Sequence, residues 1–524
     1  MNMSDSITCD DSLSPYNHTH HIHTLQDAIQ SLRIQINTMK TIQRGLDGTG
    51  DPDSAGDTAW ILTATVLVLL MTTPGIMLYY AGMVRLQNVL STAMQGYSIM
   101  CVVTFLWMCF GYSLAFAPAD SENINAVIFG DSSRFWLNGL KMGGSHQMAP
   151  TIPESVFCVF QLSFAVITPS LICGAFADRM KFTAVLVSLG LWHLIVYCPI
   201  AHANWHPNGF LYKAGVLDFA GGNVVHISAG MSALVSAIII GKRTGFGKST
   251  FHPHNMLVSL TGSCFLLIGW YGFNAGSALA ANALSGLAML NTQIASGVAS
   301  VTWMFHDIFV LGKPTVEGIM NGCIAGLVAI TPAAGFVNPT GAFVIGVVGG
   351  IACAKGVRIK DYFDFDDALD AFGIHAIGGV VGGLMLGLLA TSSVNGEDGA
   401  FYGDNGKQLS LQLYGIVITI VWSIIGTGGI MLLVDKTLGL RVSPQSELAG
   451  LDRTEHGSTL DAQMVNVPKR RKTEGLGVFY CCCCVIGDVA GAKEKIAAKK
   501  AVKSGGRTPS KPAAQAASAA AGSD

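Results

Sequence analysis

Two histidines stand out because each lies in an otherwise apolar stretch and each follows an aspartate by eight residues. The pairs are Asp218 with His226 and Asp367 with His375. An ionisable side chain costs roughly 2.5–3.5 kcal/mol to place inside a membrane segment, so each histidine is a candidate for function. Two imidazoles in contact can share one proton, since a neutral ring both donates and accepts a hydrogen bond. Such a pair offers polar partners to a small neutral molecule without holding a fixed charge.

The two aspartates have two compatible roles. Asp218 lies at the outer end of its apolar stretch, where it can stabilise a cation or cap a helix by accepting backbone N–H bonds. Asp367 is its mirror on the cytoplasmic side. A metal centre is not expected, because di-metal sites generally need more carboxylates and neither aspartate is within helical reach of its histidine.

Aromatic side chains near the same stretches form a third candidate group. Trp205 and Phe164 stand near the ends of apolar segments, where aromatic residues usually form a belt at the membrane interface. With an outward-facing hydroxyl from Ser277, they would instead form a cage that binds a cation through the faces of the rings.

The amino-acid composition indicates the kind of secondary structure that must position these residues. Of the 524 residues, 50% are hydrophobic and only 12% are charged, against about 25% charged in soluble proteins. A membrane span needs roughly 20 mostly apolar residues, and eleven segments qualify. They are 59–82, 92–117, 155–177, 182–203, 219–241, 255–275, 284–306, 317–335, 340–356, 371–391 and 411–434. The sequence therefore predicts an all-α integral membrane protein in a lipid bilayer, and a net charge of −2 gives no reason to expect nucleic acid as a partner.

Two of these boundaries divide long uncharged runs. The run 254–305 is too long for one helix and is divided at 274–285, and the run 318–354 is divided at a turn signal over 335–339.

Basic residues indicate the orientation of the spans. Ten of them fall in alternate loops that share a side with the C-terminal tail, and only about four fall in the opposite loops. We therefore expect the N-terminus outside and the C-terminus in the cytoplasm, in the plasma membrane. The chain then divides into an extracellular leader (1–58), a membrane domain (59–436), a regulatory tail (437–465) and a disordered extension (466–524).

Two short motifs recur at the same interval of spans. Asp-x7-His occurs in the fifth and tenth spans, and Ala-Val-Ile-Thr-Pro at 165–169 in the third span has a counterpart, Val-Ala-Ile-Thr-Pro, at 328–332 in the eighth. A shift of five spans makes the two halves enter the membrane from opposite sides. The pattern predicts an inverted repeat of five plus five helices, with one extra helix and a substrate path between the halves.

Four longer motifs resemble the ammonium transporter family (Amt/Mep/Rh), nearest to its plant-type members. They are Asp-Phe-Ala-Gly-Gly-Asn-Val-Val-His at 218–226, Asp-Asp-Ala-Leu-Asp-Ala-Phe-Gly-Ile-His at 366–375, Gly-Trp-Tyr-Gly-Phe-Asn-Ala-Gly-Ser at 269–277 and Phe-Gln-Leu-Ser-Phe-Ala at 160–165. The resemblance runs from about residue 74 to residue 457. It implies a homotrimeric transporter of ammonium and ammonia, with one pore per subunit, no cofactor and no enzymatic activity.

The resemblance also implies roles for individual residues. Trp205, Phe164 and Ser277 would bind ammonium at the outer vestibule, supported indirectly by Asp218. Phe164 would form a gate with Phe273.

Deeper in the pore, His226 and His375 would line the narrow part and carry the proton. The resemblance leaves open whether transport is electrogenic or channel-like.

The tail carries two candidate regulatory features. Thr454 stands where plant-type relatives have a phosphorylatable threonine, so a kinase is a possible partner, and phosphate there would close the transporter by breaking contacts with a neighbouring subunit. Basic residues at 469–472 precede a cysteine run that reads as an acylated membrane anchor. The run comprises Cys481, Cys482, Cys483 and Cys484. The leader adds a glycosylation sequon at Asn17.

Three alternatives remain open at this stage. A channel for urea or another small solute would share the fold but lack the cation cage. A membrane enzyme would use the His and Asp pairs as a metal site. A sensor would signal through the tail in addition to transporting ammonium.

Overall fold

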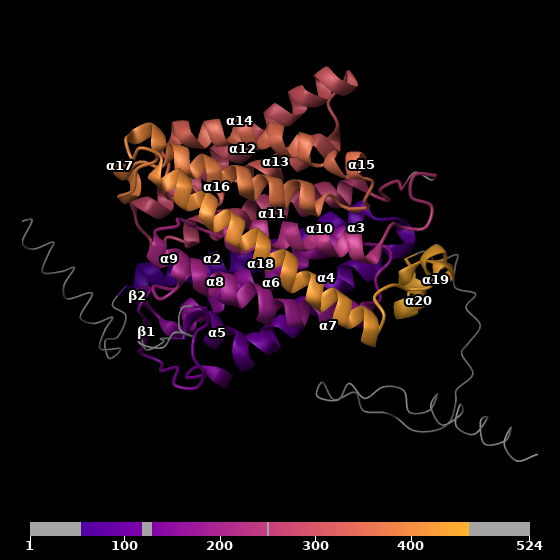
Figure 1. The fold of residues 1–524 in the computed structure, drawn as a ribbon, viewed down its shortest axis with the longest axis horizontal. Coiled ribbons are helices and arrows are strands. Elements are labelled where there is room, and N and C mark those ends of the chain that lie inside the picture. Colours follow the sequence, from indigo (N-terminus) through magenta and orange to yellow (C-terminus); the bar gives the residue numbers. More distant parts are fainter. Residues whose placement is uncertain (1–53, 118–127, 249–250, 461–524) are drawn as a thin grey trace, which may run out of the picture. The chain divides into compact units, whose positions relative to one another are not determined.

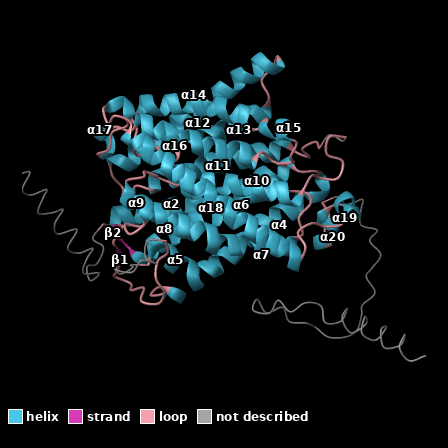
Figure 2. Cartoon of the chain, in the orientation of Figure 1, coloured by secondary structure: helices cyan, strands magenta, loops and turns pink. Residues whose placement is uncertain are grey.

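The computed structural model describes residues 54–117, 128–248 and 251–460, and almost all of its regular structure is helical (Figures 1 and 2). The first half contains α2 (Ala55–Leu70), η1 (Met71–Ile76), α3 (Met77–Met83), η2 (Leu86–Asn88), α4 (Val89–Leu106), η3 (Trp107–Gly111), α5 (Tyr112–Phe116), η5 (Phe135–Leu137), β1 (Ser145–His146), β2 (Ala149–Pro153), α6 (Glu154–Phe176), α7 (Phe182–Trp192), η6 (His193–Tyr197), α8 (Cys198–Trp205), α9 (Phe210–Ala214), η7 (Gly222–Ile227) and α10 (Ser228–Ile240). The second half contains α11 (Met256–Gly276), α12 (Ala283–Leu311), α13 (Val316–Ile330), α14 (Pro339–Gly356), α15 (Ile359–Phe363), η8 (Phe372–Ala376), α16 (Ile377–Leu389), α17 (Ser392–Asn395), η9 (Ala400–Tyr402), α18 (Lys407–Thr437), α19 (Pro444–Ala449) and α20 (Leu451–His456).

The helices account for the predicted spans. Within the described residues, ten continuous helical segments are long and apolar enough to cross a membrane. The eighth predicted span corresponds to α13, which is apolar but has only 15 residues. Ten long segments and one short helix are consistent with eleven spans, and the chain is an all-α integral membrane protein.

Both divided runs end where a side chain caps a new helix. The Asn282 side chain accepts the N–H of Ser285 at the start of α12, and Ser285 caps back onto Asn282. The Asn338 side chain accepts the N–H of Gly341 at the start of α14, with Pro339 in the first helical position. Such caps satisfy backbone donors that a helix start leaves free, so they fix both boundaries.

The helices differ in how much of their apolar surface other helices cover. In α6 the most apolar window is 89% buried, whereas in α12 it is 28% buried. Figure 1 shows α18 running obliquely across its neighbours. The helices α6, α10 and α16 are therefore largely enclosed by other helices, and α12 and α18 present apolar faces to the outside.

The inverted repeat appears in the packing around the two histidines. α10 packs against α6 and η8, and α16 packs against α13 and η7. Each histidine lies in a π-helical turn, His226 in η7 and His375 in η8. A glycine follows each histidine by four residues, and each glycine meets the other repeat. A Cβ on Gly230 would lie 2.2 Å from the backbone N of Ala376, and a Cβ on Gly379 would lie 3.2 Å from Cβ of His226.

The tail is held against the ends of two membrane helices. Asp452 of α20 accepts hydrogen bonds from the backbone N–H groups of Leu90 and Ser91 at the start of α4. Glu455 accepts a hydrogen bond from the N–H of Phe182 at the start of α7. Carboxylates stabilise helix N-termini because free N–H groups and the helix dipole both favour negative charge there. We call this side of the bundle the tail side, and the opposite side, where α2 begins, the leader side.

Candidate functional site

The histidines of the two Asp-x7-His motifs meet at the crossing of the repeats. Their Nδ1 atoms are 3.3 Å apart, and the rings lie nearly parallel with centroids separated by 5.4 Å. Both side chains are buried. One Nδ1 must carry a proton and the other must accept it, so the two rings are in opposite tautomers. The pair therefore presents one N–H donor and one lone pair on its two Nε2 atoms, which complements a molecule that both accepts and donates hydrogen bonds.

Each histidine turn is fixed at its start by an aspartate. Oδ1 of Asp218 accepts the N–H groups of Gly221 and Gly222, and Oδ2 accepts those of Asn223 and Val224. The four distances run from 2.6 to 3.2 Å. The helix-capping role of Asp218 is thus present in the structure, and its oxygens point to backbone.

The mirror residue Asp367 makes a shorter version of the same cap. It accepts the N–H groups of Ala371 and Phe372 at 3.2 and 2.8 Å, just before His375. Asp218 and Asp367 therefore share a structural role as well as a sequence spacing.

A row of aromatic rings leads from the leader side to the histidines. Trp205 lies 5.8 Å from Phe164, and Phe164 lies 4.4 Å from Phe273, between ring centroids. Phe273 is in turn 6.0 Å from His226. Phe164 and Phe273 are almost completely buried and lie in the row between Trp205 and His226, while Trp205 is partly exposed at the leader-side end.

Ser277 stands one turn beyond Phe273 on α11. Its hydroxyl donates a 2.8 Å hydrogen bond to the carbonyl of Phe273, so its lone pairs stay available as acceptors. The indole N–H of Trp205 donates to the backbone carbonyl of Asp218 at 2.9 Å, which fixes the ring beside the capped turn. The predicted cation site thus contains one oriented aromatic face and one hydroxyl that can accept a hydrogen bond.

Sequence reasoning left Trp270 without a role. Its ring stacks on His226 with centroids 5.4 Å apart and planes 17° apart, and its N–H donates to the Thr331 hydroxyl at 2.9 Å. The signal was available, because Trp270 precedes Phe273 by three residues and therefore shares its helix face.

A small cavity continues from His375 towards the tail side. Its volume is about 20 Å³, which is enough for roughly one molecule of the size of water. The lining includes Tyr79, Tyr80, Ile374 and Asp370, none of which the spacing argument singled out. Sequence alone could not find them because η1–α3 and the turn before η8 meet only in the folded bundle.

A cluster of buried and half-buried ion pairs surrounds the tail-side end of this path. Arg243 forms two 2.8 Å bonds with the Asp366 carboxylate, and Lys360 pairs with Asp370 at 2.5 Å. Burial by itself would raise the pKa of Asp366, but the hydrogen bonds and charges of Arg243 and Arg179 hold it below its ordinary value. Asp366 therefore stays ionised and anchors the segment that leads to Asp367.

Of the residues predicted to be regulatory or modified, Thr454 is the one that lies in the described part of the chain. Thr454 lies exposed in α20, and its hydroxyl donates to the carbonyl of Gly450 at 2.9 Å. The leader sequon at Asn17 and the run from Cys481 to Cys484 lie outside the described residues.

Known proteins match this chain over the whole membrane domain. The model of the Ammonium Transporter Family matches residues 59–460. An ammonium transporter of Bacillus subtilis is 45% identical over 405 residues, which cover 77% of this chain and 97% of that protein. Ammonium transporter 1 of Dictyostelium discoideum is 40% identical over 424 residues, covering 79% and 89% of the two chains.

Solved structures match as well. The crystal structure of Saccharomyces cerevisiae Mep2 superimposes with a TM-score of 0.70 at 36% identity, covering 74% of this chain and 88% of that one. The range that the family model matches, 59–460, contains both histidine turns, the aromatic row and the docked tail. The chain belongs to the Ammonium Transporter Family.

Proposed function

We propose that this protein transports ammonium by binding the cation at the leader side, removing its proton and conducting ammonia past the histidine pair. The observation that carries the proposal is the 3.3 Å contact between Nδ1 atoms of His226 and His375, at the end of a row of buried aromatic rings. This arrangement combines a proton-sharing pair with a narrow apolar path.

The first step is recruitment of ammonium. The ring face of Trp205 attracts the ammonium cation, and the Ser277 hydroxyl accepts a hydrogen bond from one N–H group of the ammonium. Asp218 supports this step indirectly, because its oxygens are already bonded to backbone N–H groups and its charge acts across the turn. Phe164 and Phe273 then move apart to admit the substrate.

The second step separates the proton from ammonia. Stripping water from an ion is costly in an apolar pore, whereas a neutral molecule pays much less. Ammonia accepts a hydrogen bond from one Nε2–H and donates to the other Nε2. The proton passes along the pair when both rings exchange tautomers, and transport is then electrogenic. Potassium resembles ammonium in size but cannot leave a proton behind, so proton transfer sets the selectivity.

Orientation and assembly complete the proposal. The excess of basic residues on the tail side favours an orientation with the tail in the cytoplasm and the leader outside. The plasma membrane is the proposed location, because uptake of external ammonium takes place there. The exposed apolar faces of α12 and α18 are compatible with a homotrimer in lipid. An exposed Thr454 is accessible to a cytoplasmic kinase.

The test is to record membrane currents from cells that express the wild-type chain. Ammonium should produce an inward current that saturates with concentration and grows with inside-negative voltage. Urea uptake serves as the comparison that separates a transporter of ammonium from a general small-solute channel. Uptake of urea without an ammonium current would overturn the proposal, and electroneutral ammonium uptake would refute only its electrogenic part.

A further inference from the structure

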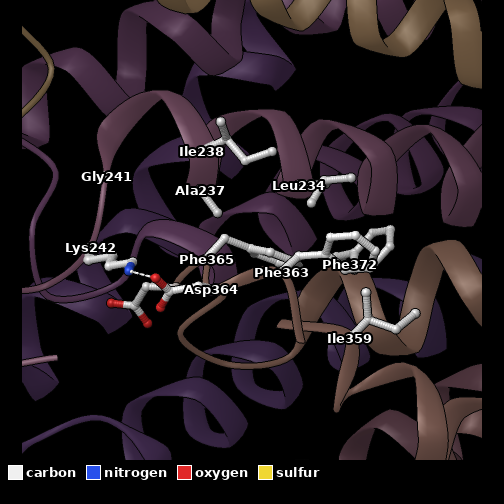
Figure 3. Close-up of a pocket in the computed structure, with 11 residues that line it drawn as sticks. Leu234, Ala237, Ile238, Gly241, Lys242, Ile359, Phe363, Asp364, Phe365 and Phe372 are labelled. Atoms are coloured by element: carbon white, nitrogen blue, oxygen red, sulfur yellow. Dashed lines mark ion pairs between the residues drawn. The ribbon is translucent and has the colours of Figure 1, made fainter. Parts of the chain in front are cut away.

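A large open groove lies on the tail side, away from the aromatic row. Its volume is about 620 Å³, and it separates the end of α10 from the segment that runs from α15 to η8 (Figure 3). Both of these elements continue into a histidine turn. The groove is therefore lined by elements of both repeats, and neither histidine is among its lining residues.

The walls of the groove are apolar. Leu234 and Ile238 follow one face of α10, and Ile238 is 59% exposed. Figure 3 shows Ile359 and the ring of Phe372 on the opposite wall. Phe363, which is 77% exposed, extends this wall outwards. Exposed apolar side chains at the end of a membrane span meet lipid rather than water, so the walls suit a hydrocarbon chain.

One end of the groove is polar. Nζ of Lys242 pairs with Oδ2 of Asp364 at 2.5 Å, and the two side chains are 41% and 74% exposed (Figure 3). Exposed ion pairs contribute little to stability, so Lys242 can exchange this partner for another anion. The other carboxylate in the lining, Asp366, is buried and already bonded to Arg243. Of the described residues that line the groove, Lys242 is the one cation.

An apolar trough that ends in one exchangeable lysine matches the shape and charge of a phospholipid. The acyl chain would lie between α10 and Phe372, and the phosphate would replace Asp364 on Lys242. Because an acyl chain is in hydrocarbon both in the bilayer and in the groove, the headgroup must decide which lipid is preferred. A cytoplasmic-side lysine attracts anionic headgroups.

We propose that this groove is a binding site for one anionic phospholipid of the cytoplasmic leaflet. The assignment to that leaflet rests on the proposed orientation of the chain, whereas the site itself rests on the groove. A lipid bound here bridges α10 and η8, so it holds together the tail-side ends of the two helices that carry His226 and His375.

Two substitutions should move the affinity in opposite directions. Lys242→Ala removes the cation and should weaken binding of phosphatidylglycerol about fivefold, the contribution of one lysine near a lipid surface. Asp364→Asn removes the competing carboxylate and tolerates the left-handed backbone of that residue (φ 55°), so it should strengthen binding. Lys313→Ala alters an exposed lysine elsewhere on the tail side and is the matched control.

The experiment is native mass spectrometry of the full-length protein in detergent, titrated with phosphatidylglycerol or phosphatidylcholine. Wild type and Lys313→Ala should each bind one phosphatidylglycerol molecule per chain more tightly than they bind any further phosphatidylglycerol molecules. A third variant, Ala237→Trp, should lose this lipid by filling the apolar wall. If phosphatidylcholine binds equally well, or if neither Lys242→Ala nor Asp364→Asn changes the affinity, the site does not exist as proposed. The readout needs no ammonium, so it is independent of the transport proposal.

Discussion

The histidine rings owe their orientation to the hydrogen bond between them and to the packing of Trp270 on His226. The ring of Trp270 lies 5.4 Å from that of His226 with planes 17° apart, and the two imidazoles, whose planes differ by 16°, meet edge to edge through their Nδ1 atoms. The hydrogen bond between the two Nδ1 atoms is the one that the structure shows for either of these imidazole rings in the described part of the chain. The turns themselves are set by the backbone caps of Asp218 and Asp367. Because these caps fix the turn independently of the imidazole, a side chain substituted at position 226 should occupy the same place. Substitution there therefore tests the role of the imidazole itself.

Replacing His226 with an acid should abolish discrimination against potassium. The His226→Asp side chain is shorter and charged, so it draws a chain of water into the space that the imidazole filled. A hydrated path removes the desolvation barrier, which in the idealised limit is of order 20 kcal/mol for a small ion. The measurement is growth and potassium current in cells that lack their own potassium uptake, with wild type beside His226→Asp and His375→Glu.

The matched apolar substitution separates selectivity from proton transfer. His226→Leu keeps the path dry, so it should stop the ammonium current without admitting potassium. If wild type and His226→Asp exclude potassium equally and ammonium currents are unchanged, the pair is structural packing.

At the scale of residues, the sequence predicted the aspartates and histidines that recur in both halves of the chain. It missed residues whose contacts form only between helices. The spacing of Asp218 to His226 and of Asp367 to His375 identified both caps and both rings. The three-residue spacing places Trp270 on the same helix face as Phe273, but its contact with the ring of His226 is seen only in the folded structure. The role of each residue in transport remains a prediction until it is tested by substitution.

At the scale of elements, the crossing of the repeats depends on two glycines. Gly230 lies one turn after His226 and faces the backbone of Ala376, while Gly379 lies one turn after His375 and faces His226. Small residues allow such close approach between helices in membranes. The π-helical turns at the same places shift the register of each helix and bring the imidazoles together.

Adding one methyl group at this crossing should separate the histidines. In Gly230→Ala the new Cβ would lie 2.2 Å from the backbone N of Ala376, so the helices must move apart. Overpacking of this kind costs about 1–3 kcal/mol, and the wider Nδ1–Nδ1 distance should lower the ammonium current more than it lowers the melting temperature. Gly429→Ala in α18 meets nothing within 4 Å and is the control. Equal currents in the two variants would show that the close crossing is unnecessary for transport.

The helix that docks the tail contains a titratable contact. His456 lies edge-on to Phe182 at 4.8 Å, and its Nε2 is 3.2 Å from the Ser91 hydroxyl. Burial lowers the pKa of His456 below 6.5, although the carboxylates of Glu455 and Asp452 act in the opposite direction. The released histidine therefore takes up a proton at a higher pH than the docked one.

Acidification should loosen α20. The stabilisation that a neutral His456 gives to docking is complete above its ordinary pKa of 6.5 and is lost as the pH falls through the lower pKa of the docked state. Burial raises the pKa of Asp452, which has the opposite effect but in a window just above 3.8. The protection factor of the α20 amides in hydrogen exchange, which corrects for the intrinsic pH dependence, should therefore fall as the pH is lowered from about 7.5 to about 5.5. The variant His456→Gln should lose this dependence, and an unchanged pH profile in that variant would assign the effect to another group.

The elements themselves were largely predictable from the sequence, because length and hydropathy define a membrane helix without reference to its neighbours. The predicted segment 155–177 became Glu154–Phe176, and 340–356 became Pro339–Gly356. The π-helical turns and the short strands β1 and β2 were not predicted. The π-helical turn η7 is accompanied by a contact between distant segments, the approach of Gly222 to Pro332, whereas β1 and β2 pair as a local hairpin that is too short to show in the sequence pattern.

At the scale of the whole molecule, a chain of polar contacts joins the tail to the pore. The Asn88 side chain accepts the N–H of Leu451 and is bonded through its amide to Asp178. Asp178 lies 3.6 Å from Arg243, which holds Asp366 next to the cap of the His375 turn. These contacts form a continuous path through buried groups, and a change at one end can reach the other if the path has two arrangements.

Phosphorylation of Thr454 is the event that should act on this path. Its hydroxyl is bonded to Gly450, where the chain passes so close to Gln87 that a Cβ would lie 2.5 Å from that residue's Cβ. α20 already presents Asp452 and Glu455 to helix N-termini, so a further negative charge adds repulsion and removes the bond to Gly450. Released α20 no longer supports the Asn88 contact.

Thr454→Asp should therefore reduce the ammonium current severalfold at equal surface abundance, because a carboxylate introduces the charge without needing the kinase. Thr454→Val removes the hydroxyl but adds no charge, so it should retain most of the current. Ser458→Asp places the same charge beyond the end of α20, on an exposed residue, and should behave like wild type. Hydrogen exchange of α20 in the three variants reports whether the tail has been released. A Thr454→Asp protein that transports like wild type while its tail is released would show that docking of the tail does not control the pore.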